Sequence, residues 1–306
     1  MATSKKLWNR FKGLFQKHSN TQQKPTAPQK ASQQPKTQKA AGSPNTSTMP
    51  TLQVALQNQT SSSNVWAYIS KSSHLALQDP RIPLITRSSD PADSATAGQA
   101  LDKNDALVLI SADAKTPYYP PSPSSTGQQL GQDVAIPLGA PGNTVTATIP
   151  RIAGGRIWFA QDNKLQFFVN PGPGLVEPSI FNQSDANVNT NFAFCEFTYN
   201  QYEVFINISY VDFVSALPIA LTLQDTSGNS QHVSGMKPNG ISQIAQGLTD
   251  QTSKDGRKWS SLIVNKSNGQ TLRILSPNSG ILLNPNWFKS YWDDYTNQGT
   301  SLHVHS

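Results

Sequence analysis

The chain has 306 residues, a formal net charge of +6 and one cysteine, Cys195, which excludes an intramolecular disulfide and a cysteine-based zinc cage. Residues 1–78 hold 10 of the 24 basic residues and no acidic one, so the remainder carries 14 basic against 18 acidic residues. That remainder lacks the basic footprint of a nucleic-acid-binding domain, and we expect no nucleic-acid partner. No apolar run reaches the length of a membrane span, and no signal peptide is visible.

The N-terminal stretch "SKKLWNRFKGLFQKH" places Leu7, Phe11 and Leu14 at helical spacing, with lysines and an arginine on the opposite side. Such a helix could make peripheral contact with an anionic membrane surface, or it could be a tail without a fixed role. Residues 20–50 are mostly Gln, Lys, Pro, Ser and Thr and cannot bury enough apolar surface to fold. Residues 1–50 are therefore predicted to be a basic amphipathic leader and a disordered linker.

From residue 51, short runs of β-branched and aromatic residues alternate with Gly, Pro, Asn and Ser, which is typical of an antiparallel sandwich or barrel. One long candidate, 194–213, is expected to form two strands joined by a hairpin turn at Asn200-Gln201. The other expected strands are 51–58, 64–70, 105–111, 144–150, 155–160, 164–170, 218–224, 259–265 and 271–276.

Two helices are expected. The first begins near Asn239, presents Ile241, Ile244, Ala245 and Leu248 on one face, and stops at Gly256. The second opens at Asn284-Pro285, an N-cap followed by proline, and carries an aromatic stripe made of Trp287, Tyr291 and Tyr295. A stripe at helical spacing favours core packing over stacking on sugar rings. The fold class is therefore mainly β with a smaller mixed α/β part.

Carboxylates are unusual in the run 194–213. The chain has three glutamates, and Glu196 and Glu203 both lie here, with Asp212 near the end of the run. Period-two alternation places Phe194, Glu196 and Thr198 on one face, so Glu196 and Asp212 could line a groove across neighbouring strands.

Paired carboxylates in a polar groove suit glycoside hydrolysis, in which one acid protonates the leaving oxygen and one carboxylate activates water or attacks the sugar. The residues leave a second interpretation open. Glu196 could instead pair with an arginine, such as Arg156 or Arg273, and Asp212 could cap a turn.

The segment "FCEFTYN", followed by "NISYVDFVSALPIALTL", resembles the β-1,3-glucanases of glycoside hydrolase family 64 and, more distantly, the thaumatin-like proteins. The resemblance extends through "GGRIWFA", "FVNPGPGLVEPSIFNQSDANVNTNFAFCEFT" and "NWFKSYWDDY", covering residues 51–296, and is greatest to fungal members. It implies a thaumatin-like β-barrel or sandwich beside a smaller mixed α/β part, with a wide groove for β-1,3-glucan between them.

The resemblance also implies an activity, which is internal cleavage of β-1,3-glucan with inversion of the anomeric centre. Glu196 matches the family's general acid, protonated when glucan binds, and Asp212 matches its ionised general base. Thr198 and Asn200 match positions that contact sugar. The family implies no metal or organic cofactor and an extracellular or cell-wall location, and we expect a monomer.

Family members continue beyond the "YWDDY" helix, whereas this chain ends with "TNQGTSLHVHS". We therefore expect residues 51–296 to be a glucanase domain that is incomplete at its C-terminus and residues 297–306 to be a tail. Missing strands would expose sheet edges and remove a groove wall. The alternative function is accordingly a non-catalytic, thaumatin-like β-1,3-glucan-binding protein.

Overall fold

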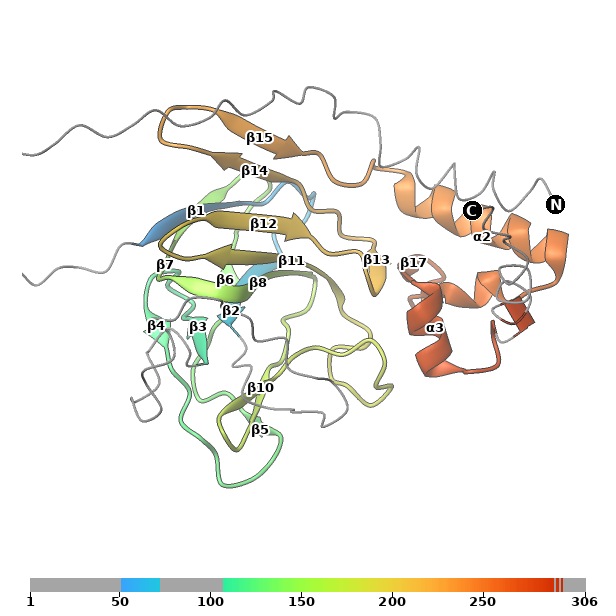
Figure 1. The fold of residues 1–306 in the computed structure, drawn as a ribbon, viewed down its shortest axis with the longest axis horizontal. Coiled ribbons are helices and arrows are strands. Elements are labelled where there is room, and N and C mark those ends of the chain that lie inside the picture. Colours follow the sequence, from blue (N-terminus) through green and yellow to red (C-terminus); the bar gives the residue numbers. More distant parts are fainter. Residues whose placement is uncertain (1–50, 72–106, 289, 292, 294–306) are drawn as a thin grey trace, which may run out of the picture. The chain divides into compact units, whose positions relative to one another are not determined.

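The structure is a computed structural model that describes residues 51–71, 107–288, 290, 291 and 293. Its largest sheet has seven strands in the order β12-β11-β8-β2-β3-β4, with β6 pairing with β2 beside β3 (Figure 1). All of these neighbours are antiparallel. The strands are β2 (Val65–Lys71), β3 (Val108–Ile110), β4 (Pro117–Tyr118), β6 (Ile136–Pro137), β8 (Ile152–Gln161), β11 (Asn191–Tyr199) and β12 (Val204–Ile208).

A second, two-stranded sheet covers one face of the large sheet. It consists of β1 (Leu52–Gln57) and β7 (Thr144–Ile149). Their inward side chains Leu56, Ala147 and Ile149 belong to one buried cluster with residues of β2, β8 and β11, including Ala67, Ile69, Ile157, Cys195 and Phe197. The alternating pattern of these strands thus buries one face as a sandwich core.

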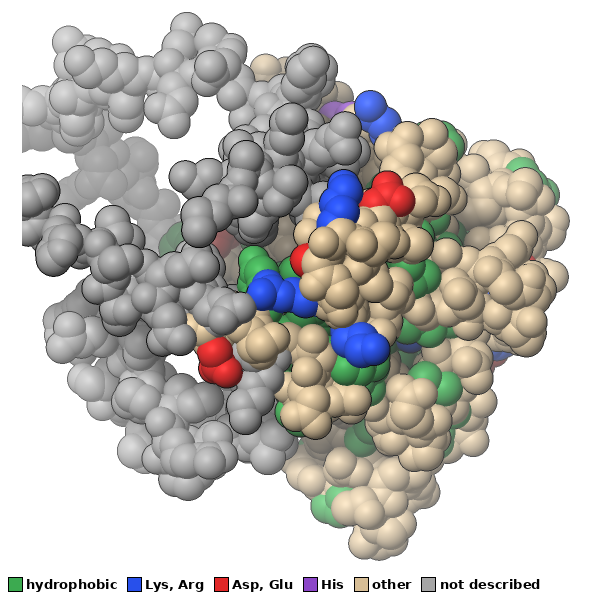
Figure 2. Space-filling view, turned by 90° about the vertical axis from the view of Figure 1, so that its right-hand side faces the viewer, with side chains coloured by type: hydrophobic (Ala, Val, Ile, Leu, Met, Phe, Trp, Pro, Cys, Tyr) green, Lys and Arg blue, Asp and Glu red, His purple; other side chains and the backbone are tan. Residues whose placement is uncertain are grey.

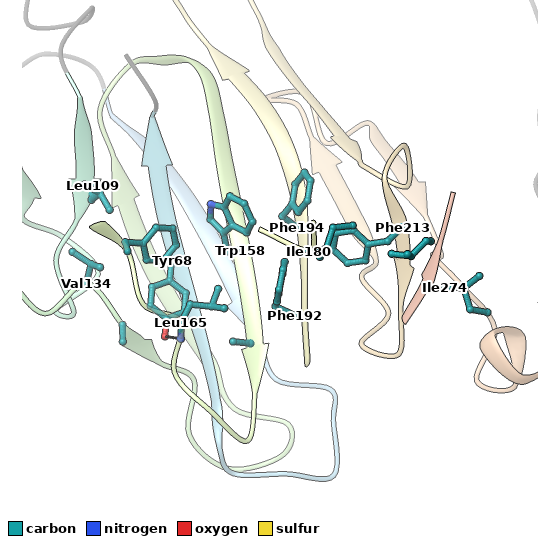
Figure 3. Close-up of a cluster of buried hydrophobic side chains, with 14 of the residues drawn as sticks. Tyr68, Leu109, Val134, Trp158, Leu165, Ile180, Phe192, Phe194, Phe213 and Ile274 are labelled. Carbon is teal, nitrogen blue, oxygen red and sulfur yellow. Dashed lines mark hydrogen bonds between the residues drawn. The ribbon is translucent and has the colours of Figure 1, made fainter. Parts of the chain in front are cut away.

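The opposite face of the large sheet is aromatic. Tyr68, Trp158 and Phe194 are cross-strand neighbours on β2, β8 and β11, and each is at least 94% buried. Figure 3 shows this row of rings continuing past Phe192 to Phe213 and Ile274. Part of its cover comes from the segment that contains a three-stranded sheet of β5 (Gln128–Gln129), β9 (Phe168–Asn170) and β10 (Gly174–Val176).

The C-terminal part mixes strands and helices. Three strands, β13 (Phe213–Ser215), β16 (Ile263–Asn265) and β17 (Thr271–Leu275), form a sheet in the order β13-β17-β16. They contact α2 (Gly240–Asp255), the 3-10 helix η3 (Trp259–Leu262) and α3 (Pro277–Leu283). A separate hairpin contains β14 (Leu221–Gln224) and β15 (Ser230–Val233). A mainly β fold with a smaller mixed α/β part is therefore confirmed.

Most expected strands are present, and four are at least three residues shorter than predicted. Only Phe168–Asn170 of the candidate 164–170, Leu221–Gln224 of 218–224 and Val108–Ile110 of 105–111 are strand, and residues 105 and 106 of the last candidate lie outside the described part. The first half of the candidate 259–265 is the helix η3. There Trp259 packs against Phe288 and Tyr291, so tertiary contacts override the local β preference.

The first helix is confirmed, since α2 packs Ile241, Ile244, Ala245 and Leu248 against the core and ends at Gly256, whose φ of 69° is left-handed. The second is corrected. Asn284 is the C-cap of the unexpected helix α3, residues 285–288 form turns and bends, and helical conformation returns at residues 290, 291 and 293. Ser276 caps α3 by accepting from the Ser279 N–H, with Pro277 in the first turn.

The predicted aromatic stripe packs as expected where it is described, because Trp287 and Tyr291 contact the aromatic core. The amphipathic leader, the linker, Tyr295 and the tail 297–306 lie outside the described residues. No helix in the described ranges is long and apolar enough to cross a bilayer. Figure 2 shows one face of the molecule, where the few charged side chains of the described residues are scattered among hydrophobic side chains, other side chains and backbone.

Candidate active site

Glu196 lies on the aromatic face, in the second half of β11. Its cross-strand neighbours are Arg156 on β8 and Asn207 on β12, and Ser70 on β2 lies opposite Arg156. We call these four residues the polar row. The polar row runs directly beside the rings of Tyr68, Trp158 and Phe194, which we call the aromatic row. The Trp158 indole N–H donates to Ser70 Oγ at 3.1 Å.

The face changes from buried to accessible along β11. Phe192 and Phe194 are 1% and 6% exposed, whereas the side chain of Glu196 is 39% exposed. Period-two alternation gives all three the same face, as predicted from the sequence for Phe194 and Glu196. A carboxylate thus emerges from the edge of an aromatic core, where a ligand can reach it.

Arg156 connects two glutamates. Its Nη2 donates to Glu196 Oε1 at 3.1 Å and its Nε donates to the same oxygen at 3.3 Å, while Nη1 pairs with Glu177 Oε2. The guanidinium carbon lies 4.8 Å from the ring centre of Phe194 and 5.5 Å from that of Trp158. The ion pair between Glu196 and an arginine, left open by the sequence, is present, and the partner is Arg156.

Arg273, the other candidate partner, occupies a different place. It is 1% exposed, donates to the Thr190 carbonyl at 2.6 Å, and stacks over the rings of Phe192 and Phe213. Burial lowers the pKa of its guanidinium to about 10, although nearby Asp185 acts in the opposite direction.

Asp212 is positioned by a different element from the one predicted. Strand β12 ends at Ile208, and Asp212 lies in a bend directly before β13, where its backbone carbonyl accepts from the Ser276 N–H at 2.8 Å. The next side chain, Phe213, packs on Phe192 at 5.4 Å and Phe194 at 6.1 Å between ring centres. The Asp212 backbone is therefore held near the aromatic face by Phe213, the residue that follows it, and Asp212 is not a cross-strand neighbour of Glu196.

The Asp212 side chain makes no hydrogen bond to another residue within the described ranges, so the predicted alternative of a turn-capping carboxylate finds no partner there. The carboxylate is partly exposed. It is thus accessible to water.

Thr198 and Asn200 continue β11 into the turn. Thr198 shares the face of Glu196, and its hydroxyl oxygen accepts from the Gly154 N–H at 3.2 Å. The side-chain oxygen of Asn200 accepts from the N–H groups of Tyr202 and Glu203 at 2.7 and 2.9 Å, which closes the predicted turn. Its amide nitrogen makes no hydrogen bond in the described part of the chain.

Two residues near the site were not found by sequence reasoning. Glu177 follows β10 and reaches Arg156, and only its rarity as one of three glutamates marked it. Phe205 on β12 lies opposite Thr198 and is 56% exposed, which leaves an aromatic ring on the accessible end of the same face. Among the described residues, no group of three or more His, Cys, Asp or Glu is arranged to hold a metal ion.

Comparison with solved structures shows that the chain has a known fold. A laminaripentaose-producing β-1,3-glucanase, solved in complex with laminaritetraose, superposes with a TM-score of 0.57 at 25% identity, over 81% of this chain and 60% of that one. A glycoside hydrolase family 64 enzyme from Paenibacillus barengoltzii, also described as laminaripentaose-producing, shares the fold with a TM-score of 0.51 at 19% identity, over 81% of this chain and 54% of that one.

Two curated relatives match part of the sequence. The glucan endo-1,3-beta-glucosidase of Cellulosimicrobium cellulans is 31% identical over 138 residues, which is 45% of this chain and 24% of the relative. The protein of the same name from Arthrobacter sp. (strain YCWD3) is 30% identical over 138 residues, with the same coverage. The chain thus corresponds to about a quarter of the length of these curated relatives.

The family model described as Beta-1,3-glucanase matches residues 85–301. This range contains β3 to α3, with Arg156, Glu177, Glu196 and Asp212. The chain therefore belongs to glycoside hydrolase family 64, the β-1,3-glucanase family.

Proposed function

We propose that the protein cleaves β-1,3-glucan internally, with inversion, and that Glu196 is the general acid and Asp212 the general base. The observation that carries the proposal is the position of Glu196, half-exposed at the edge of the aromatic face, with Asp212 beside Phe213, whose ring packs on the same face. Family membership supports the substrate, because the family model bears the description Beta-1,3-glucanase and a structural neighbour was solved with laminaritetraose.

In this mechanism the two carboxylates act from opposite sides of a glucose ring. Glu196 donates its proton to the leaving glycosidic oxygen, while Asp212 removes a proton from the water that attacks the anomeric carbon. The C–O bond to the leaving sugar breaks as the bond to water forms, and Asp212 ends with the proton. Inversion requires space for that water, a separation of about 6.5–9.5 Å between the carboxyl groups.

The remaining site residues have binding roles in this proposal. Thr198 and the amide nitrogen of Asn200 offer polar groups on the face of Glu196, and the exposed ring of Phe205 opposite Thr198 offers apolar surface to a sugar. No metal or organic cofactor takes part. We further propose that the sandwich is thaumatin-like and that the protein acts on cell-wall glucan; the expected fungal character stays a prediction, since the relatives named above are bacterial.

The test is release of reducing sugar from laminarin by the purified full chain. Glu196→Gln and Asp212→Asn are expected to lower kcat by about 10²–10⁴-fold each, because each removes one proton transfer. Glu203→Gln and Asp250→Asn are matched controls, since both carboxylates are exposed and lie outside the site, and they should leave kcat unchanged. Full activity in either site variant would contradict the proposal.

A second candidate function is glucan binding without cleavage. The ion pair between Arg156 and Glu196 favours it, because a carboxylate held by an arginine can be structural. Both functions predict retention of the protein on a laminarin column, and only hydrolysis predicts new reducing ends. A folded wild-type protein that binds laminarin and releases no reducing sugar would establish the binding function.

A further inference from the structure

Arg156 poses an electrostatic problem for the proposed mechanism. A general acid must hold its proton when substrate is bound, yet a guanidinium at 3.1 Å favours the ionised carboxylate of Glu196. The structure contains a group that offsets this effect. Glu177, whose side chain is 20% exposed, pairs with the same guanidinium through Nη1.

The contacts of Arg156 also leave one oxygen of Glu196 open. Both Nε and Nη2 donate to Oε1, and within the described ranges Oε2 accepts no hydrogen bond. A carboxylic acid that carries its proton on Oε2 can still accept at Oε1. Arg156, fixed over the Phe194 ring, can therefore hold the carboxyl group in one orientation in both protonation states.

The charges of the three groups then decide which state is favoured. When Glu177 is ionised, its negative charge offsets the positive charge of Arg156, so ionised Glu196 gains less from that arginine. If Glu177 were uncharged, protonation of Glu196 would instead leave the positive charge of Arg156 without a counter-ion. Glu177 thus favours the acid form of Glu196. The side chains of Glu177, Arg156 and Glu196 are 20%, 33% and 39% exposed, so water screens part of this effect.

Other groups around Glu196 do not replace this effect. Its neighbours in the polar row on β2 and β12 are the uncharged Ser70 and Asn207, and Thr198 on its own strand is also uncharged. Asp212 approaches from the start of β13, and Arg273 lies farther along the face, over Phe192 and Phe213. Among the described residues, Glu177 is the carboxylate seen to pair with Arg156 in addition to Glu196.

We propose that Glu177 is a positioning residue that offsets the charge of Arg156 and so helps Glu196 to hold the proton that it donates to the leaving sugar. This inference rests on the proposed function, because it assigns a role in the same proton transfer. Glu177 itself acts through Arg156 and is not expected to touch the reacting atoms.

The direct test is a carboxyl titration. Because the chain has only three glutamates, protein labelled with ¹³C at the glutamate carboxyl carbon gives three resonances, which Glu177→Gln, Glu196→Gln and Glu203→Gln assign by loss of one signal each. In Glu177→Gln, an isosteric change that retains an acceptor for Nη1, we expect the Glu196 signal to titrate about one pH unit lower than in wild type. An unchanged titration would overturn the inference.

The same variant is then followed by the pH dependence of kcat/KM on laminarin. The alkaline limb, where the general acid loses its proton, should move down by about one pH unit, so activity above the limb falls about tenfold. On the acidic side of that limb the variant should match wild type, with KM unchanged. Loss of activity at every pH with an unmoved limb would indicate a merely structural role and overturn the inference.

Arg156→Met supplies a change of opposite sign. It removes the positive charge that both glutamates contact and leaves their negative charges, so the Glu196 titration should move to higher pH. General loosening of the site would instead move the titration in the same direction in both variants. Glu203→Gln is the matched control and should leave the Glu196 titration in place.

The failure of the proposed function and the failure of this inference can be told apart. A wild-type protein that cleaves no laminarin at any pH overturns the proposed function as well. An active enzyme whose Glu177→Gln variant keeps the wild-type alkaline limb of its pH profile overturns only this inference.

Discussion

Cys195 and Glu196 are adjacent on β11 and lie in opposite environments. The thiol points into the sandwich core between the large sheet and β1–β7, where it is 1% exposed, and the carboxylate emerges on the other face. Burial raises the pKa of the Cys195 thiol to about 12, because a charged thiolate is disfavoured away from water. A neutral thiol is therefore part of the folded state.

This environment predicts a protected cysteine. At pH 8, iodoacetamide should leave Cys195 unmodified in the native protein and alkylate it fully in guanidinium chloride, as measured by mass spectrometry. Because the pKa in the folded state is higher than the usual thiol value of 9.0, the stability from the neutral thiol is present below pH 9 and is lost as pH rises toward about 12. Rapid alkylation of the native protein would contradict the assignment of Cys195 to the core.

At the scale of elements, the Phe197 ring of β11 packs directly over Gly155 of β8. A Cβ on Gly155 would lie 2.6 Å from the Phe197 ring and 2.7 Å from Ile152 Cγ2, whereas a Cβ on Gly247 in α2 meets no atom within 4 Å. The strand pair that holds Arg156 beside Glu196 thus depends on the absence of a side chain at residue 155.

Two glycine-to-alanine variants test this point in opposite directions. Gly155→Ala should lower the free energy of unfolding by about 1–3 kcal/mol, because it overpacks the core. Gly247→Ala should raise it by about 0.5–1 kcal/mol, because alanine has the higher helix propensity. Urea denaturation, monitored by circular dichroism, measures the free energy of unfolding of both variants. A Gly155→Ala protein as stable as wild type would show that the neighbouring side chains, such as the Phe197 ring, can move aside without loss of stability.

Local patterns predicted the elements whose burial follows a regular period. Alternation placed Phe194, Glu196 and Thr198 on one face, and the spacing of Ile241, Ile244 and Leu248 identified α2. The patterns failed where contacts between residues far apart in the sequence determine the local structure. η3 forms where Trp259 packs on Phe288, and α3 depends on a serine cap and proline that the strand before it obscured.

The site likewise contains residues that local patterns predicted and residues that they could not place. The alternation of β11 established the face of Glu196, and Arg156 was one of two arginines considered as its partner. The position of Asp212 was not predictable from β12, because β12 ends four residues earlier and the start of β13 determines where Asp212 lies. Glu177 could not be placed at all, since its pairing with Arg156 joins segments 21 residues apart through a loop without periodicity.

At the scale of the whole molecule, the aromatic row links the sandwich to the mixed α/β part. Rings from Tyr68 on β2 to Phe213 on β13 form one buried cluster that also includes Leu248 of α2 and Phe288 (Figure 3). Buried Arg273 reinforces the junction by stacking over Phe192 and Phe213. The packing at this junction, rather than a single strand, therefore sets the distance between Glu196 and Asp212.

In the proposed mechanism that distance determines the stereochemistry of hydrolysis, and the anomer released is the most direct measure of it. Proton NMR of laminarin hydrolysis, recorded before mutarotation equilibrates the products, reports which anomer forms first. Two carboxylates with a water between them predict α-anomeric reducing ends from the β-linked substrate. Initial release of the β-anomer would require a covalent glycosyl-enzyme intermediate and would contradict the roles assigned to Glu196 and Asp212.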